Sequence, residues 1–156
     1  MNTTTRIEIL KRVDIFAALK KRDLKLIAKS TTEEVYEPGA ALCRQGDRGV
    51  AAFIILEGTV AVEEELHKGR VIEIATLEPG SVVGELALID GAPRVATVRA
   101  KNETRVLVLT TWDFRAVLKR QPAMAGDILP VVVKRLRNLA LEIRKTDDEN
   151  PRFTIV

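Results

Sequence analysis

The sequence contains very few of the side chains that build disulfide frameworks and metal centres. It has one cysteine, Cys43, and one histidine, His67, in 156 residues. A single cysteine excludes a disulfide within the chain and fits a reducing compartment, most simply the cytoplasm. Without a second histidine there is no candidate metal cluster or catalytic triad. We therefore expect no enzyme activity, no metal and no haem or iron–sulfur cofactor.

Long apolar runs are also missing. No stretch approaches the roughly 18 apolar residues of a membrane span. The N-terminal segment MNTTTRIEILKRVDIF lacks the apolar run and the cleavage site of a secretory signal. Neither sign of charge dominates, since 25 basic and 22 acidic residues leave a formal net charge of +3. We expect no membrane segment, and a charge that permits an anionic partner without indicating nucleic acid.

The pattern of apolar residues changes twice along the chain. Helical spacing covers residues 5–30, where Asp23 is expected to cap a second short helix. Over residues 33–110, glycine-containing turns separate short runs rich in β-branched residues, such as AAFIIL and RVLVLT. Short strands at such intervals predict an antiparallel β-roll or jelly roll. Helical spacing returns over residues 111–146, where Thr110 or Thr111 is expected to cap the first helix, and it is broken at Pro122.

These zones predict one α+β domain over residues 1–146, an antiparallel β-roll flanked by N-terminal and C-terminal helices. The polar segment 147–156 is interpreted as a mobile tail. The last predicted helix carries apolar residues at intervals of 3, 4, 3 and 4, namely Leu129, Val132, Leu136, Leu139 and Ile143. This pattern fits a helix packed on its own roll or a dimer seam, and both interpretations stay open. Pro130 is either tolerated in this helix or kinks it.

The stretch GELALIDGAPRVAT, residues 84–97, combines groups that suit an anion. Gly84 permits close approach of a ligand, and ELALI is long enough for one helical turn with free N–H groups at its start. Arg94 offers a fixed fork of donors for a phosphate. Glu85 needs donors, either sugar hydroxyls or Arg94 itself. A nucleotide with a single phosphate charge would satisfy all of them, whereas a plain Glu85–Arg94 ion pair is the simpler alternative.

The ordered motif Gly84-Glu85-Leu86-Ala87-Leu88, Pro93-Arg94 and Ala96-Thr97 resembles the phosphate-binding cassette of the cyclic nucleotide-binding domain family. The version in regulatory subunits of cyclic-AMP-dependent protein kinase is especially similar. The segment from Pro38 to Val62 and the flanking helices also match, so the resemblance extends from about Val13 to Lys145. It implies a β-roll with a short phosphate-binding helix inside it.

The resemblance also implies roles for individual residues. Glu85 would accept a hydrogen bond from the ribose 2′-hydroxyl, and Arg94 would pair with the exocyclic phosphate oxygens. Backbone N–H groups of Ala87 and Val95 would complete the phosphate shell, and the C-terminal helix would cap the base. The implied ligand-binding set is Gly84, Glu85, Leu86, Ala87, Arg94, Val95, Ala96, Arg135, Asn138 and Leu139.

Val95 bears on which nucleotide binds. Family members that prefer cyclic GMP (cGMP) often carry a threonine after the arginine, and valine has no hydroxyl to offer guanine. We therefore expect cyclic AMP (cAMP) in preference to cGMP. Only about ten residues follow Lys145, so we expect no helix-turn-helix and no direct DNA binding.

The predicted function is that of a sensor module, stand-alone or excised from a larger protein. Nucleotide binding would move the C-terminal helix and so alter a surface for an unidentified protein partner, with a homodimer through that helix as one arrangement. The alternative is a ligand-free interaction scaffold with a structural Glu85–Arg94 pair. A cyclic-nucleotide hydrolase is a third interpretation, for which the sequence offers no metal cluster.

Overall fold

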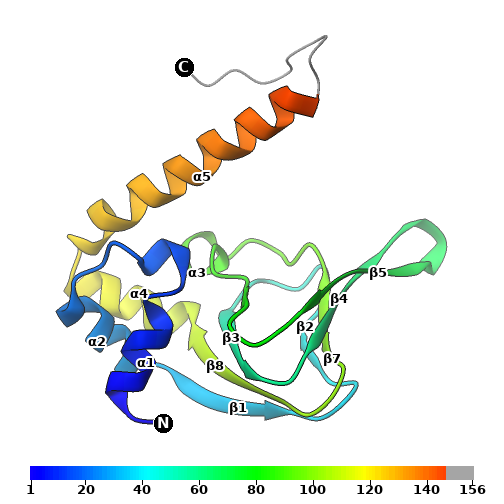
Figure 1. Ribbon diagram of the computed structural model, residues 1–156, viewed down its shortest axis with the longest axis horizontal. Helices are drawn as coiled ribbons and strands as arrows, with labels where there is room; N and C mark the ends of the chain where they lie inside the picture. The colour runs from blue at the N-terminus through cyan, green and yellow to red at the C-terminus, as the bar shows by residue number, and fades with distance from the viewer. Residues whose placement is uncertain (147–156) are drawn as a thin grey trace.

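Two four-stranded antiparallel sheets form the β-roll of the computed structural model, which describes residues 1–146 (Figure 1). The first sheet has the order β1 (Thr32–Tyr36), β8 (Thr104–Thr110), β3 (Ala51–Glu57), β6 (Val82–Val83). The second has the order β2 (Ala41–Cys43), β7 (Thr97–Ala100), β4 (Val60–Glu65), β5 (Val71–Leu77). The predicted antiparallel roll over residues 33–110 is confirmed.

Helices precede and follow the roll, as predicted. The N-terminal group consists of α1 (Thr3–Leu10), η1 (Asp14–Phe16) and α2 (Lys21–Lys29). The C-terminal pair is α4 (Thr111–Arg120) and α5 (Met124–Thr146). Within the roll, η2 (His67–Gly69) lies at the β4–β5 turn and α3 (Ala87–Asp90) lies between β6 and β7. The predicted tail, residues 147–156, falls outside the described part of the chain.

Strands β3 and β8 explain why AAFIIL and RVLVLT are apolar almost without interruption. Both strands are covered on both faces. Phe53 and Val106 face a core inside the roll, while Ile54 and Leu107 face a second core formed with the helices. In that second core the Phe16 and Phe114 rings lie 5.8 Å apart. A strand that is buried on both faces has apolar residues at successive positions, whereas a strand buried on one face alternates apolar and polar residues.

Helix boundaries agree with the predictions at one point and differ at another. Thr110 caps α4, since its hydroxyl oxygen accepts the N–H of Asp113 at 3.0 Å, and α4 ends before Pro122. The expected cap at Asp23 is wrong. α2 begins at Lys21 after an extended Lys20, so Asp23 lies inside the first turn, where it is 3% exposed. A carboxylate there still complements the positive end of the helix.

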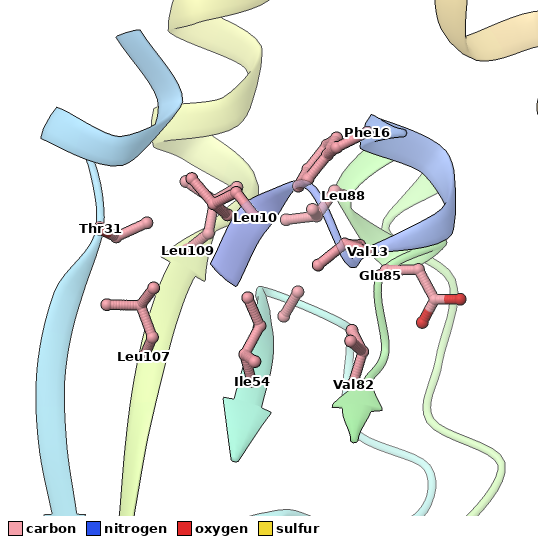
Figure 2. A pocket seen from close by; sticks show the side chains of 11 residues that line it. Leu10, Val13, Phe16, Thr31, Ile54, Val82, Glu85, Leu88, Leu107 and Leu109 are labelled. Carbon is pink, nitrogen blue, oxygen red and sulfur yellow. The ribbon is translucent and has the colours of Figure 1, made fainter. Parts of the chain in front are cut away.

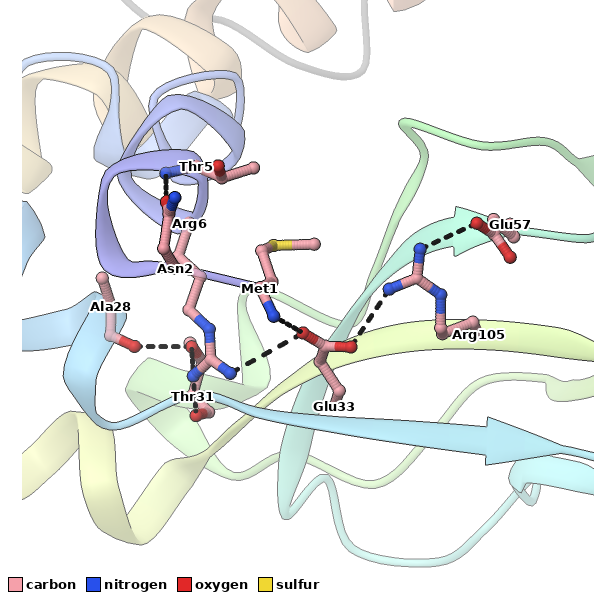
Figure 3. A network of polar contacts seen from close by, with 9 residues as sticks. All are labelled: Met1, Asn2, Thr5, Arg6, Ala28, Thr31, Glu33, Glu57 and Arg105. Carbon is pink, nitrogen blue, oxygen red and sulfur yellow. Dashed lines mark hydrogen bonds and ion pairs between the residues drawn. The ribbon is translucent and has the colours of Figure 1, made fainter.

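A charge network joins α1 to the first sheet (Figure 3). The Met1 ammonium lies 3.1 Å from Glu33 Oε1, and Arg105 contacts Oε2 of the same carboxylate at 3.0 Å. Arg105 also pairs with Glu57 at 2.8 Å. The Met1 ammonium and the Arg105 guanidinium lower the pKa of Glu33. The N-terminal helix is therefore tied to β1 and β8 by charge as well as by apolar packing.

Helix α5 runs past the roll with much of its apolar seam uncovered (Figure 1). Leu129, Leu136 and Leu139 are 60%, 49% and 54% exposed. The interpretation of this seam as a helix packed on its own roll is therefore wrong at these positions. Pro130 lies inside the helix without ending it. Among residues 1–146, no helix is both long enough and apolar enough to cross a membrane.

Candidate functional site

A pocket of about 380 Å³ opens where the loop after β6 meets the second sheet. One wall is apolar and comes from the strands, through Cys43, Val62, Leu77, Val83 and Val98. The other comes from the predicted cassette, through Gly84, Leu86, Ala87, Arg94, Val95 and Ala96. An apolar wall facing a guanidinium suits a ligand that has a flat apolar body and an anionic end.

Gly84 and α3 give the cassette its shape. Gly84 has φ +72°, and a Cβ atom there would overlap the Nη1 of Arg94. The predicted single turn is present as α3, and it ends at Gly91 in the left-handed conformation with φ 64°. A glycine is thus required at position 84 both by the backbone conformation and by the approach of Arg94.

The backbone donors of the turn are only partly free. The Ala87 N–H, expected to face a phosphate, donates to the Gly84 carbonyl at 3.2 Å. The N–H groups of Glu85, Leu86 and Val95 donate to no acceptor within residues 1–146. An anion at the start of α3 would therefore meet the free N–H groups of Glu85 and Leu86. It would compete with the Gly84 carbonyl for the N–H of Ala87.

Arg94 is a partly buried cation without a counter-ion. It makes no ion pair with any carboxylate among residues 1–146. Its Nη2 donates to the Ala51 carbonyl, and its Cζ lies 6.0 Å from the centre of the Phe53 ring. Its Nε is buried and has no hydrogen-bond partner within the described chain. A desolvated, incompletely bonded guanidinium is costly, and an anionic ligand would relieve that cost.

Glu85 does not pair with Arg94, so the structural Glu85–Arg94 ion pair of the scaffold interpretation is wrong. The Glu85 carboxylate, 17% exposed, instead pairs with Arg135 of α5 at 2.7 Å. Its side chain points away from a small apolar void of about 10 Å³ between the first sheet and the helices (Figure 2). Glu85 and Arg94 thus face different partners, and the partner of Glu85 comes from α5.

The α5 residues predicted to cap the base line a neighbouring groove of about 410 Å³. Arg135, Asn138 and Leu139 face Leu86 across it. Leu86 is the residue common to this groove and to the 380 Å³ pocket. The structure therefore brings all the predicted site residues into one region, but α5 lies beside the pocket and does not close it.

Several residues of the site were not predicted from the sequence. Ala51 and Phe53 support Arg94 from β3, and Thr111 of α4 lies within hydrogen-bond distance of Ala87. No spacing in the sequence places β3 beneath residue 94, because only the folded sheet makes that contact. Cys43 is partly buried in the pocket wall, and burial raises the pKa of its thiol.

Known proteins resemble this chain in sequence and in fold. The family model described as "Cyclic nucleotide-binding domain" matches residues 33–121. A putative potassium channel protein of Rhodopseudomonas palustris is 37% identical over 134 residues, which are 85% of this chain and 32% of the relative. The cyclic AMP receptor protein of Thermus thermophilus is 28% identical over 143 residues, which are 92% of this chain and 66% of the relative.

A solved structure shares the fold closely. The N-terminal domain of a transcriptional regulator from Streptomyces coelicolor superposes with a TM-score of 0.75 at 32% identity, covering 84% of this chain and 94% of that domain. The chain spans about a third of the channel's length and just under two thirds of the receptor protein's. The similarity is therefore to one domain that these proteins combine with other parts.

Proposed function

The chain belongs to the cyclic nucleotide-binding domain family, and on this basis we propose that it binds cAMP and acts as a regulatory module. The observation that carries the proposal is Arg94, a partly buried guanidinium whose Nε has no partner within the described chain, in a pocket walled mainly by apolar side chains. Asp90 also lines this pocket, and its carboxylate accepts the Ala92 N–H at 2.9 Å. A cyclic phosphate supplies one negative charge and exocyclic oxygens for that guanidinium. The apolar strand wall suits the base.

The remaining contacts follow from the positions of the groups. Ribose hydroxyls would donate to Glu85 once Arg135 moves off it. The N–H group of Val95, and that of Ala87 once it leaves the Gly84 carbonyl, would complete the phosphate shell. Arg135, Asn138 and Leu139 would then cap the base from α5. The preference for cAMP over cGMP rests on Val95, which has no hydroxyl for the guanine edge, and on the apolar side chains of the strand wall.

The link between binding and signalling would be the Glu85–Arg135 ion pair. The Arg135 side chain is 42% exposed while that of Glu85 is 17% exposed, so Arg135 can return to water when another donor takes its place on Glu85. A ribose that competes for Glu85 can therefore displace Arg135 at small cost and change the position of α5. The ligand can shift α5 only if it binds the protein more tightly with α5 in one position than in the other.

We place the partner surface on the exposed seam of α5, with a second copy of the chain as its simplest occupant. Leu129, Leu136 and Leu139 remain exposed along this helix, and an exposed apolar row is typical of an interface. Sedimentation of wild type and Leu136→Glu tests this. A wild-type dimer that dissociates in the variant supports it, and a wild-type monomer directs the search to another protein.

The function is tested by calorimetric titration with cAMP, cGMP and 5′-AMP, with Arg94→Ala beside the wild type. Micromolar or tighter binding of cAMP, about −8 kcal/mol or better, weaker cGMP binding and loss in the variant are expected. If none of the three nucleotides binds, the proposed function is wrong and the scaffold interpretation remains, although its Glu85–Arg94 pair is not present in the structure. Chromatography of the cAMP after incubation tests the hydrolase interpretation.

The lone Cys43 is consistent with a reducing compartment, which we propose to be the cytoplasm.

A further inference from the structure

Thr111 joins three segments that are far apart in the sequence. It is the first residue of α4 and is only 9% exposed. Its hydroxyl Oγ1 lies 3.2 Å from the Gly49 carbonyl oxygen and 3.3 Å from the Ala87 carbonyl oxygen. Gly49 belongs to the loop between β2 and β3, and Ala87 begins α3, which packs beside α4 (Figure 1). One hydroxyl thus bridges the loop and the cassette helix.

Gly49 fits closely against the cassette at this junction. It does not have a positive φ, so space alone restricts it. A Cβ there would overlap the Cβ of Ala87 and lie 2.8 Å from the Ala92 carbonyl oxygen. The Gly49 N–H donates to that same carbonyl at 3.0 Å, and the Arg94 N–H donates to the Asp47 carbonyl at 2.8 Å. The loop at residues 47–49 is therefore hydrogen-bonded to residues 92–94 of the cassette, and Gly49 packs closely against Ala87 of α3.

We propose that Thr111 is a positioning residue for the nucleotide site. It fixes α3 against the 47–49 loop, so that the start of α3 and the Arg94 guanidinium face one phosphate. This inference rests on the proposed function, because it assigns a role within the same site. Thr111 does not touch the ligand, and its effect passes through Gly49 and Ala87.

The hydrogen bonds show why the effect should fall on the ligand. The Ala87 carbonyl already accepts the Gly91 N–H at 2.8 Å, so α3 stays intact without the hydroxyl. Loss of the hydroxyl leaves the Gly49 carbonyl buried without its donor. The loop and α3 then lose their common attachment, and the two halves of the phosphate site are no longer held in register.

The experiment compares Thr111→Val and Thr111→Ser by cAMP titration and by thermal unfolding. Thr104→Val is the matched control. Thr104 is fully buried, and its hydroxyl bonds the carbonyls of Thr59 and Asn102, away from the pocket. We expect Thr111→Val to weaken cAMP binding about tenfold. Thr111→Ser should bind like wild type, and Thr104→Val should lose stability but not affinity.

Other outcomes separate the two proposals. If wild type binds cAMP and Thr111→Val binds it as tightly as Thr104→Val does, Thr111 is merely structural and the inference is wrong. If wild type binds no cyclic nucleotide, the proposed function fails, and the inference fails with it. Should Thr111→Val not fold, Gly49→Ala decides, because it displaces the same contact. Its control is Gly126→Ala in α5, where a Cβ meets nothing within 4 Å.

Discussion

Replacing Arg94 by glutamine separates binding from stability more sharply than any other single change. Glutamine removes the charge, and its shorter side chain ends near the position of the Arg94 Nε, so it also gives up the bond from Nη2 to the Ala51 carbonyl. The guanidinium has no carboxylate partner within residues 1–146, and its Nε is buried and unpaired. If Arg94 is retained for a ligand, its loss should abolish binding and leave the empty protein nearly as stable as before.

The expected magnitudes follow from these contacts. The bond from the charged Nη2 donor to the Ala51 carbonyl contributes about 1.5–3 kcal/mol, which the variant loses. Contact with the Phe53 ring adds about 0.5–1 kcal/mol. Removing the charge also removes the desolvation cost of an unpaired cation, which offsets these losses. That cost is several kcal/mol for a fully buried ion and smaller for the partly buried Arg94. The free energy of unfolding should therefore change by about 1 kcal/mol or less. Loss of the charged phosphate contact should cost about 2–5 kcal/mol of binding, roughly 30-fold to 4,000-fold in Kd.

Urea unfolding and calorimetry of wild type and Arg94→Gln, with Arg99→Gln as control, measure both quantities. Arg99 pairs with Glu63 at 3.3 Å and bonds the Gly39 carbonyl at 2.9 Å, outside the pocket. Its replacement should cost about 1 kcal/mol or less and leave Kd unchanged. A loss of more than about 2 kcal/mol in Arg94→Gln with wild-type affinity for cAMP would refute the reasoning, because Arg94 would then be structural.

Three further predictions concern single residues. Gly84→Ala should weaken cAMP binding at least tenfold and lower the melting temperature, because a Cβ there displaces Arg94; calorimetry and thermal unfolding measure both. The pKa of Glu33 is lowered by Met1 and Arg105 from its ordinary 4.5, so its contribution to stability is present above pH 4.5 and is lost as the pH falls. Urea unfolding of Glu33→Gln should therefore depend less steeply on acid pH than that of wild type. Burial, and then the hydrogen bond to Glu34, raise the pKa of Tyr36 above its ordinary value of 10.0. The absorbance of this single tyrosine should therefore remain that of the neutral phenol past pH 10 in the folded protein. Ionisation near pH 10 would contradict its burial.

The features predicted correctly are those that depend on neighbouring residues. The turn at residues 84–91 follows from Gly84, a short apolar helical run and Gly91. The cap at Thr110 and the end of α4 before Pro122 follow from local hydrogen bonding and from the missing N–H of proline. The local rule failed at Asp23, because the N-cap is Lys20, three residues earlier, and the expected cap is buried in the first turn of the helix.

The partners of the charged groups could not be predicted in this way. Glu85 was expected to meet either a ligand or Arg94, nine residues away, and it meets Arg135, fifty residues away. Arg94 was expected to bind a phosphate, but its present contacts come from β3. Long side chains reach several groups at once, so their pairing depends on how α5 and β3 lie relative to the cassette.

The sequence by itself determined the order of helices and strands, the conformation of the cassette and the kinds of group that face a ligand. These depend on backbone sterics and on apolar periods of 2 and 3.6 residues, which act over a few residues. Only the tertiary structure decided that Arg94 has no counter-ion among residues 1–146, that Arg135 of α5 pairs with Glu85, and that Thr111 joins the cassette to the 47–49 loop. Those contacts depend on packing. Packing brings together segments that are far apart in the sequence, and burial determines the free-energy cost of an unpaired charge.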